Sequence, residues 1–290
     1  MAEVVPSISF EFFPPRTLAA SFQVWESLHY LAPLSPDFIS ITYGADGSTR
    51  DRTQEMVETI DSNYAFDVAP HLTCANMSKE DTLDIAKRCW DIGVRQIVAL
   101  RGDPPKRNTK FIPHPDGFND SVELIEALVG SGFKNIRVGA YPELHPDASS
   151  MDANIDWLKG KFDAGATSAI TQFFFEPETF LRFRDKCVKA GIEAPIIPGI
   201  LPIENWEKNK IFIARCGAHI PENIEKKFIA ANRDELADDL SVFIATEMCS
   251  NLVSEGIEQF HFYTLNRPTL THKVCKNLGI TPTIMQKKEA

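Results

Sequence analysis

The chain lacks most of the short sequence signatures by which an enzyme's chemistry is usually read. Neither the glycine-rich fingerprint of a dinucleotide-binding crevice nor the P-loop motif occurs in its 290 residues, which argues against both kinds of nucleotide site. The chain also has no nucleophile elbow and no zinc-protease motif, and none of its six cysteines forms a Cys-x-x-Cys pair. Serine-hydrolase chemistry, a metal site and a redox dithiol are therefore all disfavoured.

Three further absences concern the surroundings in which the protein works. No run of about 18 apolar residues occurs, so a membrane span is not expected. The first residues lack the basic region and apolar block of a secretory signal. A net charge of −10 leaves no general excess of basic side chains for a nucleic-acid backbone. Together with the scattered cysteines, these absences predict a cytoplasmic protein that binds neither membranes nor nucleic acids.

What the chain does contain is a repeated pattern, in which short apolar runs alternate with amphipathic segments. The runs are continuous rather than alternating, as expected for parallel strands covered on both faces. They occupy residues 7–13, 38–43, 67–73, 96–100, 136–141, 168–175, 196–201 and 260–265. Helices are predicted over residues 78–92, 119–129, 151–164, 176–190 and 234–254. A glycine stands at the end of four of these helices, at positions 93, 165, 191 and 256.

Eight strands that alternate with helices in a chain of this length predict an α/β fold of the (β/α)8 TIM-barrel type. A doubly wound sheet is the competing architecture, and it would usually carry a glycine-rich turn after its first strand. Pro14 and Pro15 stand at that place instead. No linker or shift in composition is visible, so we expect residues 1–290 to form a single domain.

The most unusual single residue is Glu11, which lies in the apolar, aromatic first strand within the sequence SFEFFPPR at residues 9–16. An ionised carboxylate in apolar surroundings is unfavourable unless something compensates for its burial. A raised pKa would resolve the conflict and would suit a proton donor in catalysis. The alternative is that Glu11 points to solvent at an edge or pairs with an arginine.

Polar residues also stand at or just after the ends of seven of the eight predicted strands. Catalytic groups of TIM barrels come from this end of the strands, where they converge on one face. The residues are Glu11, Thr42, Tyr43, His71, Thr73, Arg101, Asp103, Tyr141, Glu143, His145, Gln172, Thr264, Asn266 and Arg267. Two carboxyl groups, an amide, an imidazole and aromatic rings suit a flat polar heterocycle and proton transfer, with the electron chemistry left to a cofactor.

Each of these residues also has a purely structural interpretation, which the sequence leaves open. His71 could be a hydrogen-bonded core histidine. Asp103 could cap a turn or pair with Arg101. Gln172 could be a buried amide bonded to a neighbouring strand, and Arg267 could belong to a surface salt bridge.

In order along the chain, the strand ends resemble those of the methylenetetrahydrofolate reductase family. The matching stretches are SFEFFPPR (9–16), ITYGA (41–45), PHLTC (70–74), LRGDP (100–104), AYPELH (140–145), DAGATSAITQFFF (163–175), IPGILP (197–202) and FHFYTLNR (260–267). The length is similar to that of bacterial members, which consist of the catalytic barrel alone. The resemblance implies a barrel that binds FAD, oxidises NADH or NADPH in a first stage, and then reduces 5,10-methylenetetrahydrofolate to 5-methyltetrahydrofolate for methionine synthesis.

The resemblance also implies roles for individual residues. Glu11 corresponds to the general acid that protonates the folate, and Asp103 to a carboxylate near the flavin and the pterin. Gln172 and Phe212 correspond to positions in the site that folate and nicotinamide share. Arg267 corresponds to a basic residue that contacts folate, and Lys208 stands near the folate where bacterial members carry Gln. Flavin-binding positions correspond to Thr42, Tyr43, Ala45, His71, Arg101, Gly102, Asp103, Ser121, Tyr141, His145, Ala148, Asn154 and Lys161.

The chain departs from the family pattern around the position expected for the adenosine half of FAD. Asn154 stands where an Asp is usual, Trp157 where bacterial members often have Asn, and Gly160 where they often have Arg. Asp120 replaces an aromatic residue before Ser121. The resemblance therefore leaves open how this chain holds the adenosine.

Two other functions compete with a flavin-dependent reductase. One is a flavin-free barrel that binds folate and transfers a one-carbon group. The other is a non-catalytic binding subunit, and the presence of both Glu11 and Asp103 argues against it. Because no ribose-reading motif is recognisable, the choice of NADH over NADPH follows only the resemblance to bacterial members. The same resemblance implies a homo-oligomer.

Overall fold

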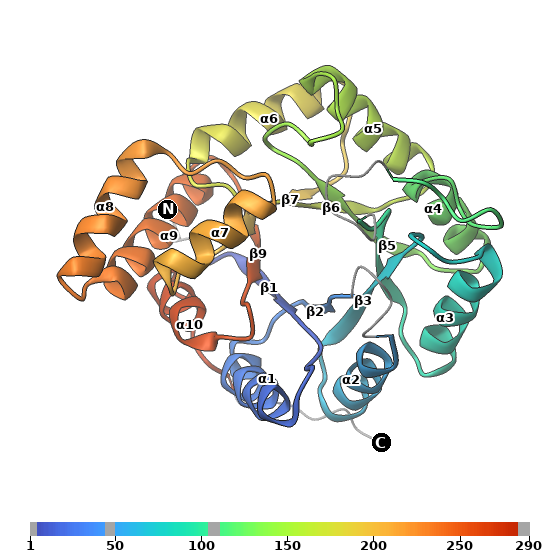
Figure 1. The fold of residues 1–290 in the computed structure, drawn as a ribbon, viewed down its shortest axis with the longest axis horizontal. Helices are drawn as coiled ribbons and strands as arrows, with labels where there is room; N and C mark the ends of the chain where they lie inside the picture. The colour runs from blue at the N-terminus through green and yellow to red at the C-terminus, as the bar shows by residue number, and fades with distance from the viewer. Residues whose placement is uncertain (1–4, 44–49, 104–110, 284–290) are drawn as a thin grey trace.

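The computed structural model describes residues 5–43, 50–103 and 111–283, and within them nine strand segments form one sheet surrounded by helices (Figure 1). Every strand pair is parallel. The strands are β1 (Ser7–Phe12), β2 (Phe38–Ile41), β3 (Asp67–Thr73), β4 (Gln96–Leu100), β5 (Asn135–Ala140), β6 (Ser168–Thr171), β7 (Ile196–Ile197), β8 (Gly199–Ile200) and β9 (Gln259–Tyr263).

The sheet closes on itself through the segment that contains β7 and β8. β7 pairs with β6, whereas β8 pairs with β9, although only Pro198 separates the two strands. The predicted single strand over residues 196–201 is thus corrected to two short segments. Pro198 has no N–H for the ladder, but its carbonyl accepts from His261 N at 3.0 Å. β7 and β8 are the first and last strands in the order of the sheet, and they are adjacent in the chain, so the sheet closes into a barrel. The prediction of a TIM barrel is confirmed, and the alternative of a doubly wound sheet is wrong.

Helices follow the strands in the order that a barrel requires. They are α1 (Leu18–Leu31), the short 3₁₀ helix η1 (Ala32–Leu34), α2 (Arg50–Asn63), α3 (Lys79–Asp91), α4 (Ser121–Gly130), α5 (Met151–Asp163), α6 (Pro177–Lys189), α7 (Trp206–Arg215), α8 (Glu222–Arg233), α9 (Ala237–Ser254) and α10 (Pro268–Asn277). The four glycines predicted to end helices all have positive φ angles. α9 begins three residues later than predicted, since Glu235 takes a left-handed turn with a φ of 60° after α8. No helix in the described ranges combines the length and apolar character that a membrane crossing requires.

Alternation along the strands separates the barrel interior from the layer beneath the helices. Phe10 and Phe12 of β1 are fully buried in that outer layer, together with Ile39 and Ile41 of β2. Glu11 stands between the two phenylalanines and therefore faces the interior. A small apolar plug fills the middle of the interior and consists of Phe38, Ala69, Val98 and Ile170.

The segment between β8 and β9 folds into the three helices α7, α8 and α9. Trp206 of α7 stacks on Phe228 of α8 with the ring centroids 4.8 Å apart, and both belong to one apolar cluster with Phe173. Phe173 follows β6, so this cluster holds α7 beside the carboxyl end of the barrel, next to β9 in Figure 1. β2 and β6 end sooner than predicted, which leaves Thr42 and Gln172 in the loops that follow these strands.

Candidate active site

Glu11 and His71 meet inside the carboxyl-terminal end of the barrel. Glu11 Oε2 lies 3.5 Å from His71 Nε2, and each side chain keeps only 11% of its accessible surface. Burial raises the pKa of Glu11 to about 8 and lowers the pKa of His71 to about 4. At neutral pH the pair therefore consists of a protonated carboxyl group and a neutral imidazole. The alternative of a carboxylate that points to solvent is wrong.

A second histidine inside the barrel, His261 of β9, shows what a structural imidazole looks like in this fold. Ser9 Oγ lies 2.7 Å from its Nδ1, and Ser40 Oγ lies 3.3 Å from its Nε2. By contrast, His71 Nε2 is buried and has no hydrogen-bond partner among the residues that the structure describes. The interpretation as a satisfied core histidine therefore fits His261 and does not fit His71.

Tyr263 stands beside Glu11, although the sequence pattern did not single it out. The two residues are register partners where β1 pairs with β9. The Tyr263 hydroxyl donates to Thr171 O at 2.7 Å, and its ring packs edge to face against Phe173 with centroids 5.6 Å apart. Burial raises the pKa of Tyr263 well above its usual value, so the ring stays neutral. The signal that could have found it is its spacing of two residues from His261, which puts both inside the barrel.

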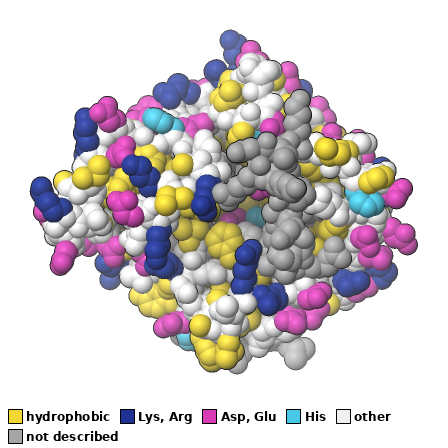
Figure 2. Space-filling view, viewed as in Figure 1, with side chains coloured by type: hydrophobic (Ala, Val, Ile, Leu, Met, Phe, Trp, Pro, Cys, Tyr) yellow, Lys and Arg dark blue, Asp and Glu magenta, His cyan; other side chains and the backbone are white. Residues whose placement is uncertain are grey.

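A cleft of about 650 Å³ opens where β3, β4 and β5 end and extends to α4 and α5. Most residues to which the resemblance assigns flavin contacts line it: Tyr43, Arg101, Gly102, Asp103, Ser121, Tyr141, His145, Asn154 and Lys161. Distant segments of the chain thus converge on one cavity at the catalytic end of the barrel. On the face shown in Figure 2, apolar side chains lie at the centre, with Lys and Arg side chains close beside them.

Two cationic side chains stand in this cleft. Lys161 Nζ donates to Gly139 O at 2.8 Å. Burial and, to a smaller degree, the nearby Arg101 lower the pKa of Lys161 to about 8. Arg101 Nη2 lies 2.8 Å from Asp147 Oδ2, so Arg101 has an ion-pair partner other than Asp103, for which a pairing with Arg101 was left open from the sequence. A bound anion would favour the charged form of Lys161, which suits a phosphate-bearing ligand.

Aromatic rings form one wall of the cleft. The centroids of Tyr141 and His145 are 4.4 Å apart, and those of His145 and Trp157 are 5.8 Å apart, both edge to face. Asn154 Nδ2 donates to Tyr141 O at 2.9 Å and so fixes α5 against the end of β5. Such a wall suits a ligand with flat rings. Trp157 and Gly160 line the cleft as well, although the resemblance pointed to them only as departures from the family.

Gly102 sets the position of Asp103 at the end of β4. Its φ is +84°, and a Cβ there would lie 2.9 Å from the Cβ atoms of Thr73 and Ala75. Any other residue would be strained and would push the turn outward. Asp103 follows directly and presents an exposed side chain to the cleft.

Some predicted flavin contacts lie elsewhere. Thr42 and Ala148 do not line the cleft, and His71 stands with Glu11 inside the barrel. Thr42 N donates to Phe12 O at 2.9 Å, which ties the end of β2 to β1. Ala148 N donates to His145 O at 2.9 Å and closes the turn that carries His145. The predicted contact at position 45 lies outside the described residues.

The residues assigned to the substrate sit around the same end of the barrel but make contacts of their own. Phe212 of α7 packs against Phe173 with centroids 5.7 Å apart. Arg267 Nη1 lies 2.7 Å from Glu204 Oε2, so the salt bridge considered from the sequence is present. Gln172 Oε1 accepts from the adjacent Phe173 N at 3.1 Å and not from a neighbouring strand.

Lys208, one turn before Phe212 on α7, is exposed. Arg267 is the N-cap residue of α10 and is also exposed. The two cations thus stand on α7 and at the start of α10, which lie on the side of the barrel away from α4 and α5 (Figure 1). Within the described ranges, no group of three or more His, Cys, Asp and Glu side chains is arranged to hold a metal ion.

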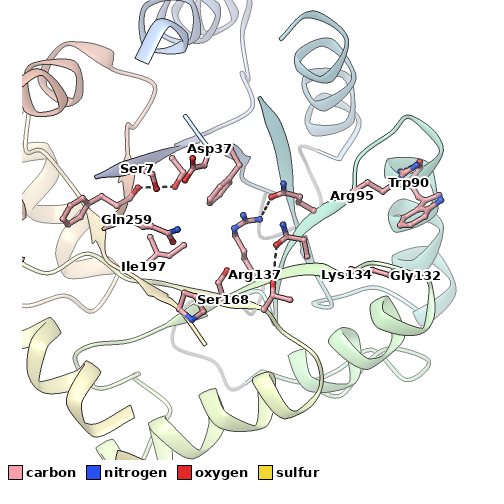
Figure 3. A pocket seen from close by; sticks show the side chains of 17 residues that line it. Ser7, Asp37, Trp90, Arg95, Gly132, Lys134, Arg137, Ser168, Ile197 and Gln259 are labelled. Carbon is pink, nitrogen blue, oxygen red and sulfur yellow. Dashed lines mark hydrogen bonds between the residues drawn. The ribbon is translucent and has the colours of Figure 1, made fainter. Parts of the chain in front are cut away.

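A second and larger cavity, about 740 Å³, lies at the opposite end of the barrel (Figure 3). Residues that begin strands line it, among them Ser7, Gln96 and Gln259. Arg137 of β5 lies near its centre. None of the residues predicted to act on cofactor or substrate lines this cavity. Volume alone therefore does not identify the active site.

Comparison with known proteins finds a family model that matches nearly the whole chain. Residues 1–279 match the family model for methylenetetrahydrofolate reductase. The 5,10-methylenetetrahydrofolate reductase of Pectobacterium carotovorum is 43% identical over 279 residues, which cover 96% of this chain and 92% of that protein. Its namesake from Escherichia coli K12 is 42% identical over 278 residues, or 95% of this chain and 92% of that protein.

More distant similarities extend to a plant protein and to a solved structure. A rice protein, named probable methylenetetrahydrofolate reductase (NADH), is 35% identical over 285 residues, which cover 94% of this chain and 48% of that protein. An uncharacterised Clostridium thermocellum protein, described as binding two copies of 5-methyl-5,6,7,8-tetrahydrofolic acid, superposes with a TM-score of 0.61. That alignment covers 95% of each chain at 13% identity, so it shows a shared barrel fold.

Proposed function

Because the chain belongs to the methylenetetrahydrofolate reductase family, we propose that it reduces 5,10-methylenetetrahydrofolate to 5-methyltetrahydrofolate. The observation that carries the proposal is Glu11, a carboxyl group buried beside His71 inside the carboxyl-terminal end of the barrel, where burial raises its pKa to about 8. Reductive opening of the folate's five-membered ring needs a proton as well as a hydride. The product would supply methyl groups for methionine synthesis.

FAD is the cofactor that the family implies, and the chemistry of the cleft fits it. Lys161 and Arg101 offer positive charge for a pyrophosphate. The negative pyrophosphate would in turn favour the charged form of Lys161, whose pKa burial lowers to about 8. Tyr141 and His145 offer rings for a flat heterocycle. When bound, the flavin supplies the two-electron chemistry that the side chains of this chain cannot perform.

Glu11 acts as the general acid in this proposal. It donates its proton to a nitrogen of the folate's five-membered ring, the carbon–nitrogen bond breaks, and the resulting iminium carbon accepts hydride. His71, neutral and 3.5 Å away, stands beside the carboxyl group without ionising it. The carboxylate left after proton transfer is disfavoured by its burial, so Glu11 regains a proton before the next turnover.

Asp103 has a different role, because its side chain is exposed in the cleft. With FAD bound in the cleft, a carboxylate at this position would disfavour negative charge on the flavin ring and would so favour its role as a hydride donor. The same carboxylate can accept hydrogen bonds from the pterin. Asp103 should therefore affect both half-reactions, whereas Glu11 should affect only the reduction of folate.

The side chains around α7 and α10 would hold the substrate. Phe212 offers an aromatic face and Gln172 an amide for the rings of nicotinamide and folate. Lys208 and Arg267 offer cations for the glutamate tail of the folate. Since the salt bridge between Arg267 and Glu204 is half exposed, it contributes little and can open to release the guanidinium.

We further propose NADH as the electron donor, which the name of the rice relative supports. A cytoplasmic location stays a prediction from the sequence, and it accords with six cysteines of which none forms a disulfide. Assembly into a homo-oligomer also stays a prediction, and analytical ultracentrifugation would test it.

Anaerobic stopped-flow absorbance tests the proposed function. Mixing the FAD-loaded protein with NADH should bleach the flavin, and 5,10-methylenetetrahydrofolate should then restore its colour. NADPH, used in parallel, should bleach it more slowly. A colourless protein that neither binds FAD nor reduces folate would contradict the proposal and would favour a flavin-free one-carbon transferase.

A further inference from the structure

We propose that Trp157 stacks on the adenine ring of the bound dinucleotide, and that Gly160 leaves the space in which the ring lies. The inference rests on the proposed function, since it assumes that the cleft holds FAD. It names a recognition device in this chain's own residues, a stacking surface where the family pattern has polar side chains.

The exposure of Trp157 is the first observation. Its side chain is 45% exposed, although tryptophan is usually well buried. It is not an isolated surface residue, because it lines the cleft and contacts His145 edge to face, with the ring centroids 5.8 Å apart. An indole with much of its surface uncovered, at the rim of a ligand cleft, is suited to bind a flat ring by stacking.

The second observation is the space next to this indole. Gly160 follows Trp157 by three residues, so both lie on the same face of α5. A Cβ added at Gly160 would meet only Val122 Cγ2, at 3.9 Å. Gly160 and Val122 both line the cleft. The face of α5 beside Trp157 is therefore bare and bordered by an apolar group, which leaves room for an uncharged ring.

The position of Lys161 indicates where each part of a dinucleotide would lie in the cleft. Lys161 follows Trp157 by four residues, about one helical turn, and its ammonium group reaches Gly139 O on β5. The cation thus lies nearer the barrel, and the indole lies nearer the rim. A dinucleotide whose flavin end approaches Glu11 would place its pyrophosphate by Lys161 and its adenine by Trp157.

Flavin titrations test the inference. Apoprotein is titrated with FAD and with FMN, which lacks the adenosine, and fluorescence reports binding of each. Trp157→Ala should raise the Kd for FAD about tenfold to a hundredfold, the usual range for stacking of a base on an aromatic side chain. The Kd for FMN should change less than twofold. Trp157→Phe should recover most of the FAD affinity.

Two further variants separate the inference from a folding defect. Gly160→Leu fills the proposed space but improves helix propensity, so it should weaken FAD and leave both FMN binding and thermal stability intact. Phe243→Ala, at an aromatic side chain of α9 that is 58% exposed and far from the cleft in the fold, should change neither Kd. Unchanged FAD binding in Trp157→Ala, or an equal loss of FMN, would overturn the inference. Failure of the unmodified chain to bind either flavin would instead contradict the proposed cofactor.

Discussion

The two ends of this barrel both hold a large cavity and both contain buried ionisable groups, yet the surroundings of those groups differ. At the amino-terminal end, Arg137 donates to Gln96, whose amide donates to Asp67, and the guanidinium stacks on Phe38 at 3.7 Å. At the carboxyl-terminal end, Glu11 faces His71 without a hydrogen bond to it. At the first end Arg137, Gln96 and Asp67 bond to one another, although Arg137 Nε has no hydrogen-bond partner among the residues that the structure describes. At the second end the carboxyl group of Glu11 and His71 Nε2 remain available to a ligand.

The two ends also differ in how burial changes the pKa values of their buried groups. Burial lowers the pKa of Arg137 only to about 10, so it keeps its charge, and the nearby Asp67 and Asp37 favour that charge. Burial alone raises the pKa of Glu11 to about 8, with no compensating partner. Buried groups that lack partners reduce stability, and they are tolerated mainly where function needs them. The amino-terminal end therefore serves stability, and the carboxyl-terminal end serves chemistry.

Glu11 should show the largest effect of mutation at the carboxyl-terminal end. Replacing it in Glu11→Gln should slow reoxidation of the reduced flavin by 5,10-methylenetetrahydrofolate about 10²–10⁴-fold, the usual contribution of a general acid. Flavin reduction by NADH should stay within about twofold, because no proton from Glu11 is needed there. Anaerobic stopped-flow absorbance measures both rates. Equal rates in the variant and the parent would show that Glu11 is not the acid.

The amino-terminal end should respond to mutation in stability and not in rate. Arg137→Ala would leave the Gln96 side chain without its donor and uncover Phe38, so it should lower the free energy of unfolding by about 1–3 kcal/mol. Urea denaturation measures this loss. Lys134→Ala, at an exposed residue of the same cavity, is the matched control and should change stability by less than about 0.5 kcal/mol. A slowed half-reaction in Arg137→Ala would remove the proposed division between the two ends.

The pKa of Glu11 also predicts a pH dependence of stability. Its folded-state pKa of about 8 exceeds the value of 4.5 expected in the unfolded chain, so between these values the folded state binds more protons. This group therefore makes stability fall as pH rises from about 4.5 to 8. Glu11→Gln should remove that slope and raise the free energy of unfolding at pH 7 by about 1–3 kcal/mol. Urea denaturation of both proteins from pH 5 to pH 9 tests it.

At lower pH in the same experiment, His71 contributes a slope of stability against pH that has the opposite sign to that of Glu11. Its folded-state pKa of about 4 lies below the usual 6.5, so stability from this group rises with pH between these values. A stability difference between Glu11→Gln and the parent that stays constant from pH 5 to pH 9 would mean that Glu11 is ionised in the folded protein.

The smallest expected effect is at Asp103, which is exposed. Asp103→Asn should slow both half-reactions, each about tenfold, because an exposed charge acts through a more polar environment than a buried one. The same stopped-flow measurements report it. A loss confined to folate reduction would place Asp103 with Glu11 and would leave the flavin without a carboxylate neighbour from this position.

Much of the fold followed from local patterns. Apolar runs, helix periodicity and glycine at helix ends predicted seven strands and five helices with errors of up to four residues at their ends, the largest at the end of β6. The seventh strand was predicted too simply, because whether residues on either side of Pro198 pair with β6 or with β9 depends on how the barrel closes. Pairing across a closed sheet is a long-range property that no local window contains.

For the site, sequence alone determined which residue types stand at the strand ends, and the resemblance supplied candidate roles for them. The residue pattern alone could not decide which of His71 and His261 is a structural histidine, since both lie inside apolar strands. The tertiary structure decided between them by giving hydroxyl partners to one imidazole and a carboxyl group to the other. It also showed Trp157 at the rim of the cleft rather than in a core. The physical reason is that burial and hydrogen-bond satisfaction depend on neighbours far apart in the chain, which only the closed barrel brings together.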